Sequence, residues 1–282
     1  MAVKSDLIIS VARNCGDFIL DGVPASLTGS TVDHLNLIFP LSQQMQGAGF
    51  YIYSGAGAGQ ERVVGSFTPA SHRMVFPQVF ASIPSVNSAF LVTKKFLWGD
   101  YKNALDRYMG IARSKHLVDK VATLALVATQ YEYPVPSGME YIQTLRIVPT
   151  GNSDYAADSV VDSIFEIPQR FWRIEKNVGG SYTISVDPRK INLGEFDNYI
   201  CRVNGQSRPD LMGSDNATAL PELEEYLING ATMHMASLLP QTNTGGLNPL
   251  FYMYKDVVKG SQGSPGLEDY IYTYPSGKKV TG

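Results

Sequence analysis

The chain has 282 residues, with 23 Lys and Arg against 26 Asp and Glu, so its formal net charge at neutral pH is −3. This length is enough to bury a sizeable core, in one large domain or in two to three small ones. Because the balance is mildly acidic and no basic patch stands out, we expect no DNA-coating function.

Neither the cysteines nor the apolar runs indicate a metal site or a membrane anchor. Cys15 and Cys201 have no metal-ligand spacing and lie in apolar runs, so both are expected to be buried, reduced thiols. The opening MAVKSDLIIS is too short and too polar for a signal peptide, and no apolar run approaches the roughly 18 residues of a membrane span. We therefore expect a protein that is made in the cytoplasm and does not enter a membrane.

The N-terminal part has a helical pattern. Residues 3 to 15 carry apolar side chains at helical spacing, and Gly16 follows as a stop signal. Residues 20 to 46 are mixed, and TVDHLNLIFPLSQQM within them is compatible with one or two more helical turns. We expect residues 1 to 46 to form an N-terminal helical segment.

The next fifty residues have the pattern of short strands. FYIYS, ERVVGSFT, RMVF and AFLVTKK are rich in β-branched and aromatic residues and are separated by Gly, Pro, Ser and Asn. Residues 47 to 97 are expected to form a small barrel-like or meander β module.

Within this module, YIYSGAGAGQERVV has two interpretations. A phosphate-binding loop of the Walker type needs Lys-Ser/Thr and a helix after the glycines, whereas this loop is followed by a β-type run. The pattern favours a β-hairpin with glycines at its tip, and an anion site stays the alternative. We expect the hairpin to project towards a neighbour through Gly55, Gly57, Gly59, Gln60 and Arg62.

The remainder alternates between helix and strand. Residues 98 to 118 form an amphipathic helix, and residues 119 to 210 hold five strand-like runs typical of a β-sandwich. Residues 211 to 240 contain the clearest helix, PELEEYLINGATMHMASLL, with Pro at its first position and glutamates in its first turn. The expected fold class is therefore α+β, mostly β, with a small β-barrel-like module and a β-sandwich joined by amphipathic helices.

The last segment, residues 241 to 282, is expected to be an extended tail. It is dense in Tyr, Phe and Met, and we find no helical or sheet period in it. An aromatic-rich tail without a core favours docking on another chain, and the alternative is a tail that folds back on its own domain. The residues expected to dock on a partner or neighbour, from the last helix and the tail, are Tyr226, His234, Leu238, Phe251, Tyr252, Tyr254, Tyr270, Tyr272 and Tyr274.

Catalytic patterns are sparse. None of His34, His72, His116 and His234 lies in a zinc-binding spacing, and no G-x-S-x-G elbow is present. We expect no catalytic residue, metal or cofactor. Paired carboxylates for glycosidic chemistry could be drawn only from Asp154 and Asp158, in a polar run that is typical of a surface loop.

Two stretches resemble the head-to-tail adaptor (neck or connector) proteins of tailed bacteriophages. They are GFYIYSGAGAGQERVVGSFTPASHRMVF, followed by AFLVTKKF and a helix, and DPRKINLGEFDNYICRVNGQSRPDLMGSD with the later LPELEEYLINGATMHMASLL. The similarity is one of pattern and covers about two thirds of the chain, leaving out the first helix and the last 40 or so residues.

This resemblance implies a role in the virion neck. Such proteins form a ring, commonly a dodecamer, beneath the portal; the ring extends the DNA channel and supports stopper or tail proteins. Carried over, Pro221 to Leu239 and the tail from Thr242 would face the portal or a neighbour. DNA would pass through the lumen without specific binding.

Two other classes stay open. A tail-associated receptor- or carbohydrate-binding β protein would share the sandwich and the aromatics, although Trp98 and Trp172 lie in element-like runs that favour core burial. An enzyme would need Asp154 and Asp158.

Overall fold

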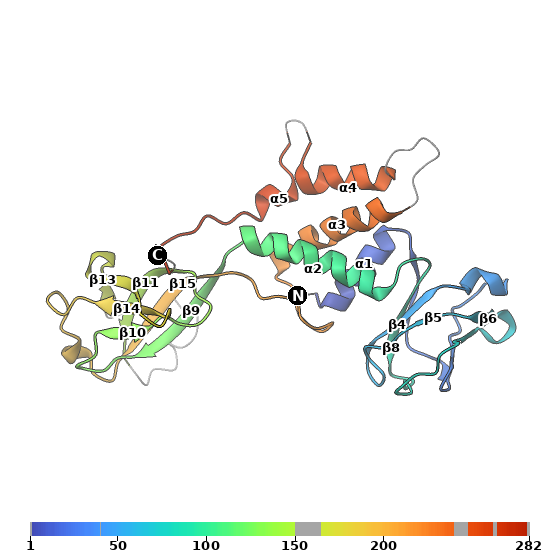
Figure 1. The fold of residues 1–282 in the computed structure, drawn as a ribbon, viewed down its shortest axis with the longest axis horizontal. Coiled ribbons are helices and arrows are strands. Elements are labelled where there is room, and N and C mark those ends of the chain that lie inside the picture. The colour runs from blue at the N-terminus through green and yellow to red at the C-terminus, as the bar shows by residue number, and fades with distance from the viewer. Residues whose placement is uncertain (1, 40, 150–164, 240–247, 262–263, 281–282) are drawn as a thin grey trace. The chain divides into compact units, whose positions relative to one another are not determined.

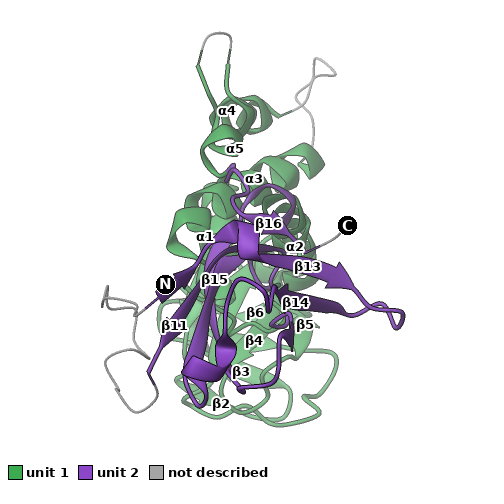
Figure 2. Cartoon of the chain, turned by 90° about the vertical axis from the view of Figure 1, so that its left-hand side faces the viewer, with its two compact units in different colours: residues 1–112, 211–271 green, residues 113–210, 272–282 purple. Residues whose placement is uncertain are grey.

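The computed structural model describes residues 2–39, 41–149, 165–239, 248–261 and 264–280. The chain divides into two compact units, coloured separately in Figure 2: unit 1 comprises residues 1–112 and 211–271, and unit 2 comprises residues 113–210 and 272–282. The fold is α+β and mostly β, as predicted, with antiparallel sheets in both units.

The helices of unit 1 pack around one apolar core. They are α1 (Lys4–Asn14), α2 (Trp98–Lys115), α3 (Pro221–Leu238), α4 (Pro249–Lys259) and the short α5 (Leu267–Tyr270). Helix α3 is central because α1 and α4 both pack against it (Figure 1). Its Gly230 lies so close to the Tyr108 ring of α2 that a Cβ there would approach a ring carbon to 2.3 Å, so the glycine permits the helices to touch. The core contains Leu7, Tyr101, Leu105, Tyr226, Leu227, Met235 and Val258.

The β module of unit 1 is built from two four-stranded antiparallel sheets around a second core. One sheet has the order β1 (Phe18–Gly22), β8 (Ala89–Thr93), β4 (Gly49–Ser54), β5 (Glu61–Val63). The other has the order β2 (Ser26–Leu27), β3 (Thr31–Asp33), β7 (Arg73–Val75), β6 (Ser66–Thr68). Aromatic rings fill the space between them, with Phe50 stacked on Phe90 at 4.9 Å and tilted on Phe76 at 4.8 Å.

The prediction that residues 1–46 form a helical segment is wrong in part. Helix α1 exists as predicted, but β1, β2 and β3 follow it, and the short 3₁₀ helix Ser42–Met45 is the remaining helical turn in the described part of residues 20–46. β1 pairs with β8, about seventy residues later, and a partner that distant leaves no local signal in the sequence.

Unit 2 consists of two antiparallel sheets that share one core, as expected for the sandwich. The larger has the order β12 (Phe165–Ile167), β11 (Tyr141–Val148), β15 (Ile200–Ser207), β9 (Val118–Ala125). The smaller has the order β10 (Glu132–Pro134), β14 (Tyr182–Val186), β13 (Trp172–Lys176). The shared core contains Leu145, Ile147, Trp172, Ile184 and Val203.

The C-terminal segment does not lack periodic structure, contrary to the sequence-based expectation. Pro249–Lys259 is helix α4, and Lys278–Lys279 forms β16, which pairs with β11 of unit 2. Val258 and Val280 are buried in the cores of units 1 and 2 respectively. Parts of this segment therefore belong to the two units, which was the alternative that the sequence left open.

Candidate functional site

The glycine-rich stretch is a hairpin. β4 and β5 pair antiparallel, with Tyr51 opposite Glu61, and Gly55, Gly57 and Gly59 at the tip all have φ between +78° and +89°. Only glycine adopts such φ values at low cost, which explains their spacing. Because a strand follows the loop, no helix N-terminus lies behind it to bind a phosphate.

The tip does not project freely, because it is hydrogen-bonded to the loop at residues 79–88. The Gln60 carboxamide donates to the Ser82 carbonyl at 2.7 Å and accepts the Ala81 N–H at 2.7 Å. The Ser88 hydroxyl donates to the Ala56 carbonyl at 2.7 Å, and Arg62 donates to the Val79 carbonyl at 3.0 Å. The tip of the hairpin is thus packed against its own β module and does not form the projecting element that the sequence predicted.

Replacing Gln60 with alanine is expected to destabilise unit 1 by about 2 kcal/mol, since each lost hydrogen bond is worth about 1 kcal/mol. Limited proteolysis should then cut within residues 79–88 at lower protease concentration than in the unmodified protein. Gln78→Ala is the matched control, because Gln78 is exposed in the same module and its side chain makes no hydrogen bond to a described residue. Equal effects of the two substitutions would show that Gln60 does not hold the tip.

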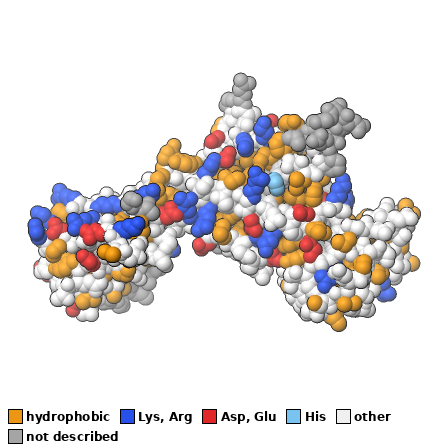
Figure 3. Space-filling model, viewed as in Figure 1, with side chains coloured by type: hydrophobic (Ala, Val, Ile, Leu, Met, Phe, Trp, Pro, Cys, Tyr) orange, Lys and Arg blue, Asp and Glu red, His pale blue; other side chains and the backbone are white. Residues whose placement is uncertain are grey.

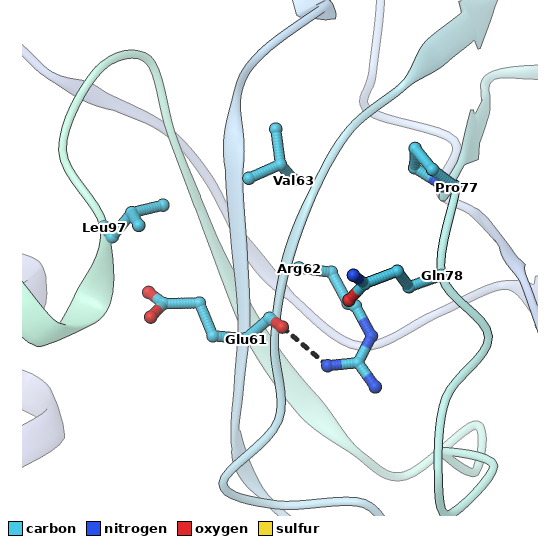
Figure 4. Close-up of a pocket in the computed structure, with 6 residues that line it drawn as sticks. All are labelled: Glu61, Arg62, Val63, Pro77, Gln78 and Leu97. Atoms are coloured by element: carbon cyan, nitrogen blue, oxygen red, sulfur yellow. Dashed lines mark hydrogen bonds between the residues drawn. The ribbon is translucent and has the colours of Figure 1, made fainter.

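A cavity of about 350 Å³ lies beside the hairpin and is shown in Figure 4. Both charged side chains that line it, those of Glu61 and Arg62, form hydrogen bonds within the protein. The Glu61 carboxylate accepts the N–H of Trp98 at 2.5 Å and so caps α2, whose positive N-terminal end favours a carboxylate. Burial raises the pKa of Glu61, while hydrogen bonds from the Trp98 and Gly99 backbone oppose that shift. Arg62 donates to the Glu61 carbonyl at 2.7 Å, so the cavity offers no free acid or base pair.

The predicted docking residues divide into three groups. The prediction that Tyr226 docks on a partner is wrong. Tyr226 is 1% exposed, and its ring contacts that of Tyr108 edge to face at 5.8 Å, so it packs in the core of unit 1. His234, Phe251 and Tyr254 are partly buried, and burial lowers the pKa of His234, helped by nearby Arg107. The exposed members are Leu238, Tyr252, Tyr270, Tyr272 and Tyr274.

Helix α4 exposes hydrophobic side chains to the outside. The Asn248 side chain accepts the Leu250 N–H at 3.0 Å and Pro249 occupies the first helical position, so the helix begins with two recognised start signals. Its inner side packs on α3 through Phe251, Tyr254 and Val258. Three hydrophobic residues of its outer side, here called the α4 face, are Tyr252, Met253 and Val257, each between 41% and 51% exposed; the charged Lys255, Asp256 and Lys259 are exposed beside them.

Two loops of the β module also carry exposed hydrophobic side chains. Some of them are extensively exposed, with Ile38 at 78%. Figure 3 shows hydrophobic side chains at the surface of both the helical part and the β module of unit 1. We use the name loop surface for these exposed residues of two loops, which the sequence analysis did not identify: Leu35, Ile38 and Leu41 of the first loop, and Val79, Ile83 and Val86 of the second.

Catalytic and metal chemistry has no geometric support in the described residues. Among them, no three His, Cys, Asp or Glu side chains are grouped so that they could hold a metal ion. Cys15 and Cys201 are buried free thiols, as predicted, and burial raises the pKa of both to about 12. Asp154 and Asp158 lie outside the described residues. None of the described helices combines the length and apolar character that a membrane crossing requires.

The comparisons with known proteins add little. No protein-family model matches the sequence, and no curated protein matches it either. One similar solved structure is the neck of an empty GTA particle, computed with C6 symmetry; the match is 15% identical and covers 62% of this chain and 76% of that chain. Its TM-score is 0.19, and a score this low does not establish a shared fold.

Proposed function

We propose that this chain is a structural protein of a phage-like particle and not an enzyme. It acts as a head-to-tail adaptor in the neck, where copies form a ring under the portal, extend the DNA channel and carry the stopper or tail proteins. Assembly takes place in the host cytoplasm. The resemblance of the two sequence stretches to such adaptors motivates the proposal.

One observation carries it further: unit 1 exposes large hydrophobic side chains both on α4 and on loops of the β module. The α4 face and the loop surface share no residue and belong to different parts of unit 1. Where exposed hydrophobic side chains gather into a large patch, that patch marks a site of contact with a partner. A closed ring needs heterologous contacts between two unlike surfaces of each subunit, and the portal and tail partners need further ones.

The α4 face replaces most of α3 as the proposed portal-docking surface. Because α3 lies between α1 and α4, it has little surface to offer, whereas Tyr252 and Met253 present large contact areas. A ring of such faces binds by avidity, so each contact can be weak.

The test compares two double variants of α4. Mass photometry and negative-stain images of the protein alone and with a portal ring should show ring-sized assemblies, and Tyr252→Ala with Val257→Ala should abolish them. Truncation after Pro240 is a poorer test because it removes Val258 from the core of unit 1.

The matched control is Lys255→Ala with Asp256→Ala. Both residues are exposed on the same helix, and the double change removes one charge of each sign while it leaves the α4 face intact. Ring formation should survive in this control. A monomer or trimer that ignores the portal would overturn the adaptor proposal and favour receptor or carbohydrate binding.

The receptor-binding alternative has less support. Neither tryptophan offers a platform for a sugar, because Trp98 and Trp172 are 4% and 3% exposed and belong to the cores of units 1 and 2.

A further inference from the structure

Unit 2 contains a polar surface pocket that the proposed function does not yet use. Its volume is about 400 Å³, and three of its residues are arginines. We call it the arginine pocket; its lining is Arg170, Phe171, Trp172, Arg173, Ser185, Val186, Asp187, Pro188 and Arg189.

Strand pairing brings these residues together from two parts of the sequence. β13 pairs with β14 so that Trp172 lies opposite Val186 and Arg173 opposite Ser185. The 3₁₀ turn Gln169–Phe171 precedes β13 and carries Arg170, and the chain that leaves β14 carries Arg189. The Asp187 N–H donates to the Phe171 carbonyl at 2.8 Å, which ties these two flanking segments together.

The pocket has an excess of positive charge. Arg173 forms an ion pair with Glu175, but no carboxylate among the described residues pairs with Arg170 or Arg189. Asp187 is the one acidic residue in the lining, and its side chain accepts the backbone N–H of Arg189 at 2.9 Å. All three arginines are exposed, so their guanidinium groups can reach an anion outside the protein.

The side chains that line the pocket suit phosphate groups better than nucleic-acid bases. A guanidinium group matches two phosphate oxygens with two parallel N–H donors. Single-stranded nucleic acids also need open aromatic faces. Here the Arg170 guanidinium lies over one face of the Phe171 ring at 4.8 Å, and the Lys278 ammonium lies over one face of the Trp172 ring at 4.1 Å; the Trp172 side chain is also buried.

We propose that the arginine pocket binds the phosphodiester backbone of double-stranded DNA. This inference rests on the proposed function, because a neck ring surrounds DNA and the pocket then marks the surface of unit 2 that faces the lumen. Contacts to phosphates carry no sequence information, so they can hold a duplex of any sequence. In a chain with net charge −3, a few arginines per subunit give weak, salt-sensitive binding that a moving duplex can break.

The experiment measures the fluorescence anisotropy of a labelled random-sequence duplex with the full chain, from low to moderate NaCl. The double variant Arg170→Gln with Arg189→Gln removes two phosphate contacts and should lower the slope of log affinity against log salt by about two. The matched control is Lys102→Gln with Arg107→Gln on α2 of unit 1, which removes the same charge elsewhere and should leave the slope near that of the unmodified protein.

Three results would overturn the inference. The first is no binding at low salt, and the second is an equal loss of salt slope in both double variants. The third is that a polyglutamate peptide displaces the labelled duplex and an unlabelled duplex does not. That third result would assign the pocket to an acidic protein segment. Mass photometry of the same samples separates this inference from the adaptor proposal. If rings form but DNA binding ignores the pocket variant, the inference alone fails; if no ring forms, the adaptor proposal fails.

Discussion

Replacing Asp106 with alanine is expected to destabilise unit 1 by about 3 kcal/mol, because it leaves a buried ammonium group without its counter-charge. The Lys4 side chain is completely buried, and its Nζ lies 2.5 Å from the Asp106 carboxylate and 2.8 Å from the Met212 carbonyl. After the substitution, a single neutral acceptor remains for the charge. The estimate lies at the low end for buried pairs because Asp106 is 44% exposed.

Replacing Lys4, the other member of the ion pair, should destabilise unit 1 less than replacing Asp106. Lys4→Met removes the buried charge, keeps most of the apolar volume and leaves Asp106 partly in water, so about 1–2 kcal/mol should be lost, mainly from the unpaired Met212 carbonyl. The double variant Lys4→Met with Asp106→Ala should then be close to Lys4→Met alone, since the two residues interact directly.

The two tryptophans permit a clean measurement. Trp98 belongs to unit 1 and Trp172 to unit 2, so urea unfolding in a Trp172→Phe background reports on unit 1 through Trp98 fluorescence. Asp256→Ala, at an exposed position of unit 1 without an ion pair to a described residue, is the control and should change stability by less than about 0.5 kcal/mol. An Asp106→Ala effect no larger than that of Lys4→Met would contradict the argument.

Elements with a local signal could be predicted from the sequence. Helices α1, α2 and α3 follow from the 3.6-residue period of their apolar positions, and the β4–β5 hairpin follows from two β-type runs that flank glycines. Helix α4 was missed although its polar and apolar positions follow a helical period, because it is only 11 residues long and lies between runs of loop composition. The pair Asn248–Pro249, a cap followed by a first-turn proline, was the available signal.

The surfaces were harder to predict than the elements. An apolar helix face such as that of Tyr226 has the same pattern whether it packs in a core or binds a partner, and here the core of unit 1 takes it. The arginine pocket exists only because β13 and β14 pair, so no run of basic residues announces it. The loop surface has no period at all, because its residues belong to irregular loops.

Replacing Asp17 with alanine is expected to have the largest effect on unit 1, about 4 kcal/mol. This carboxylate is 2% exposed and accepts the Tyr101 hydroxyl at 2.6 Å and the backbone N–H groups of Lys95 and Phe96 at 2.9 and 3.2 Å. Its loss leaves three donors without an acceptor, and each unpaired buried group costs about 1–3 kcal/mol. Burial and the Asp17 hydrogen bond raise the pKa of Tyr101, so the phenol stays a donor at any ordinary pH.

Three variants, measured by the same Trp98 fluorescence, should form a graded series. Asp17→Asn keeps an acceptor and should cost about 2 kcal/mol, and Tyr101→Phe removes one donor and should cost about 1 kcal/mol. Asp17 follows α1, and its partners lie at the end of β8 and in α2, so the carboxylate joins the β module to the helices. The adaptor proposal places one contact surface on each of these parts. The rings of a folded Asp17→Asn protein should therefore dissociate at a lower temperature than the one at which the protein unfolds. If the rings dissociate only when the protein unfolds, this junction has no separate role in assembly.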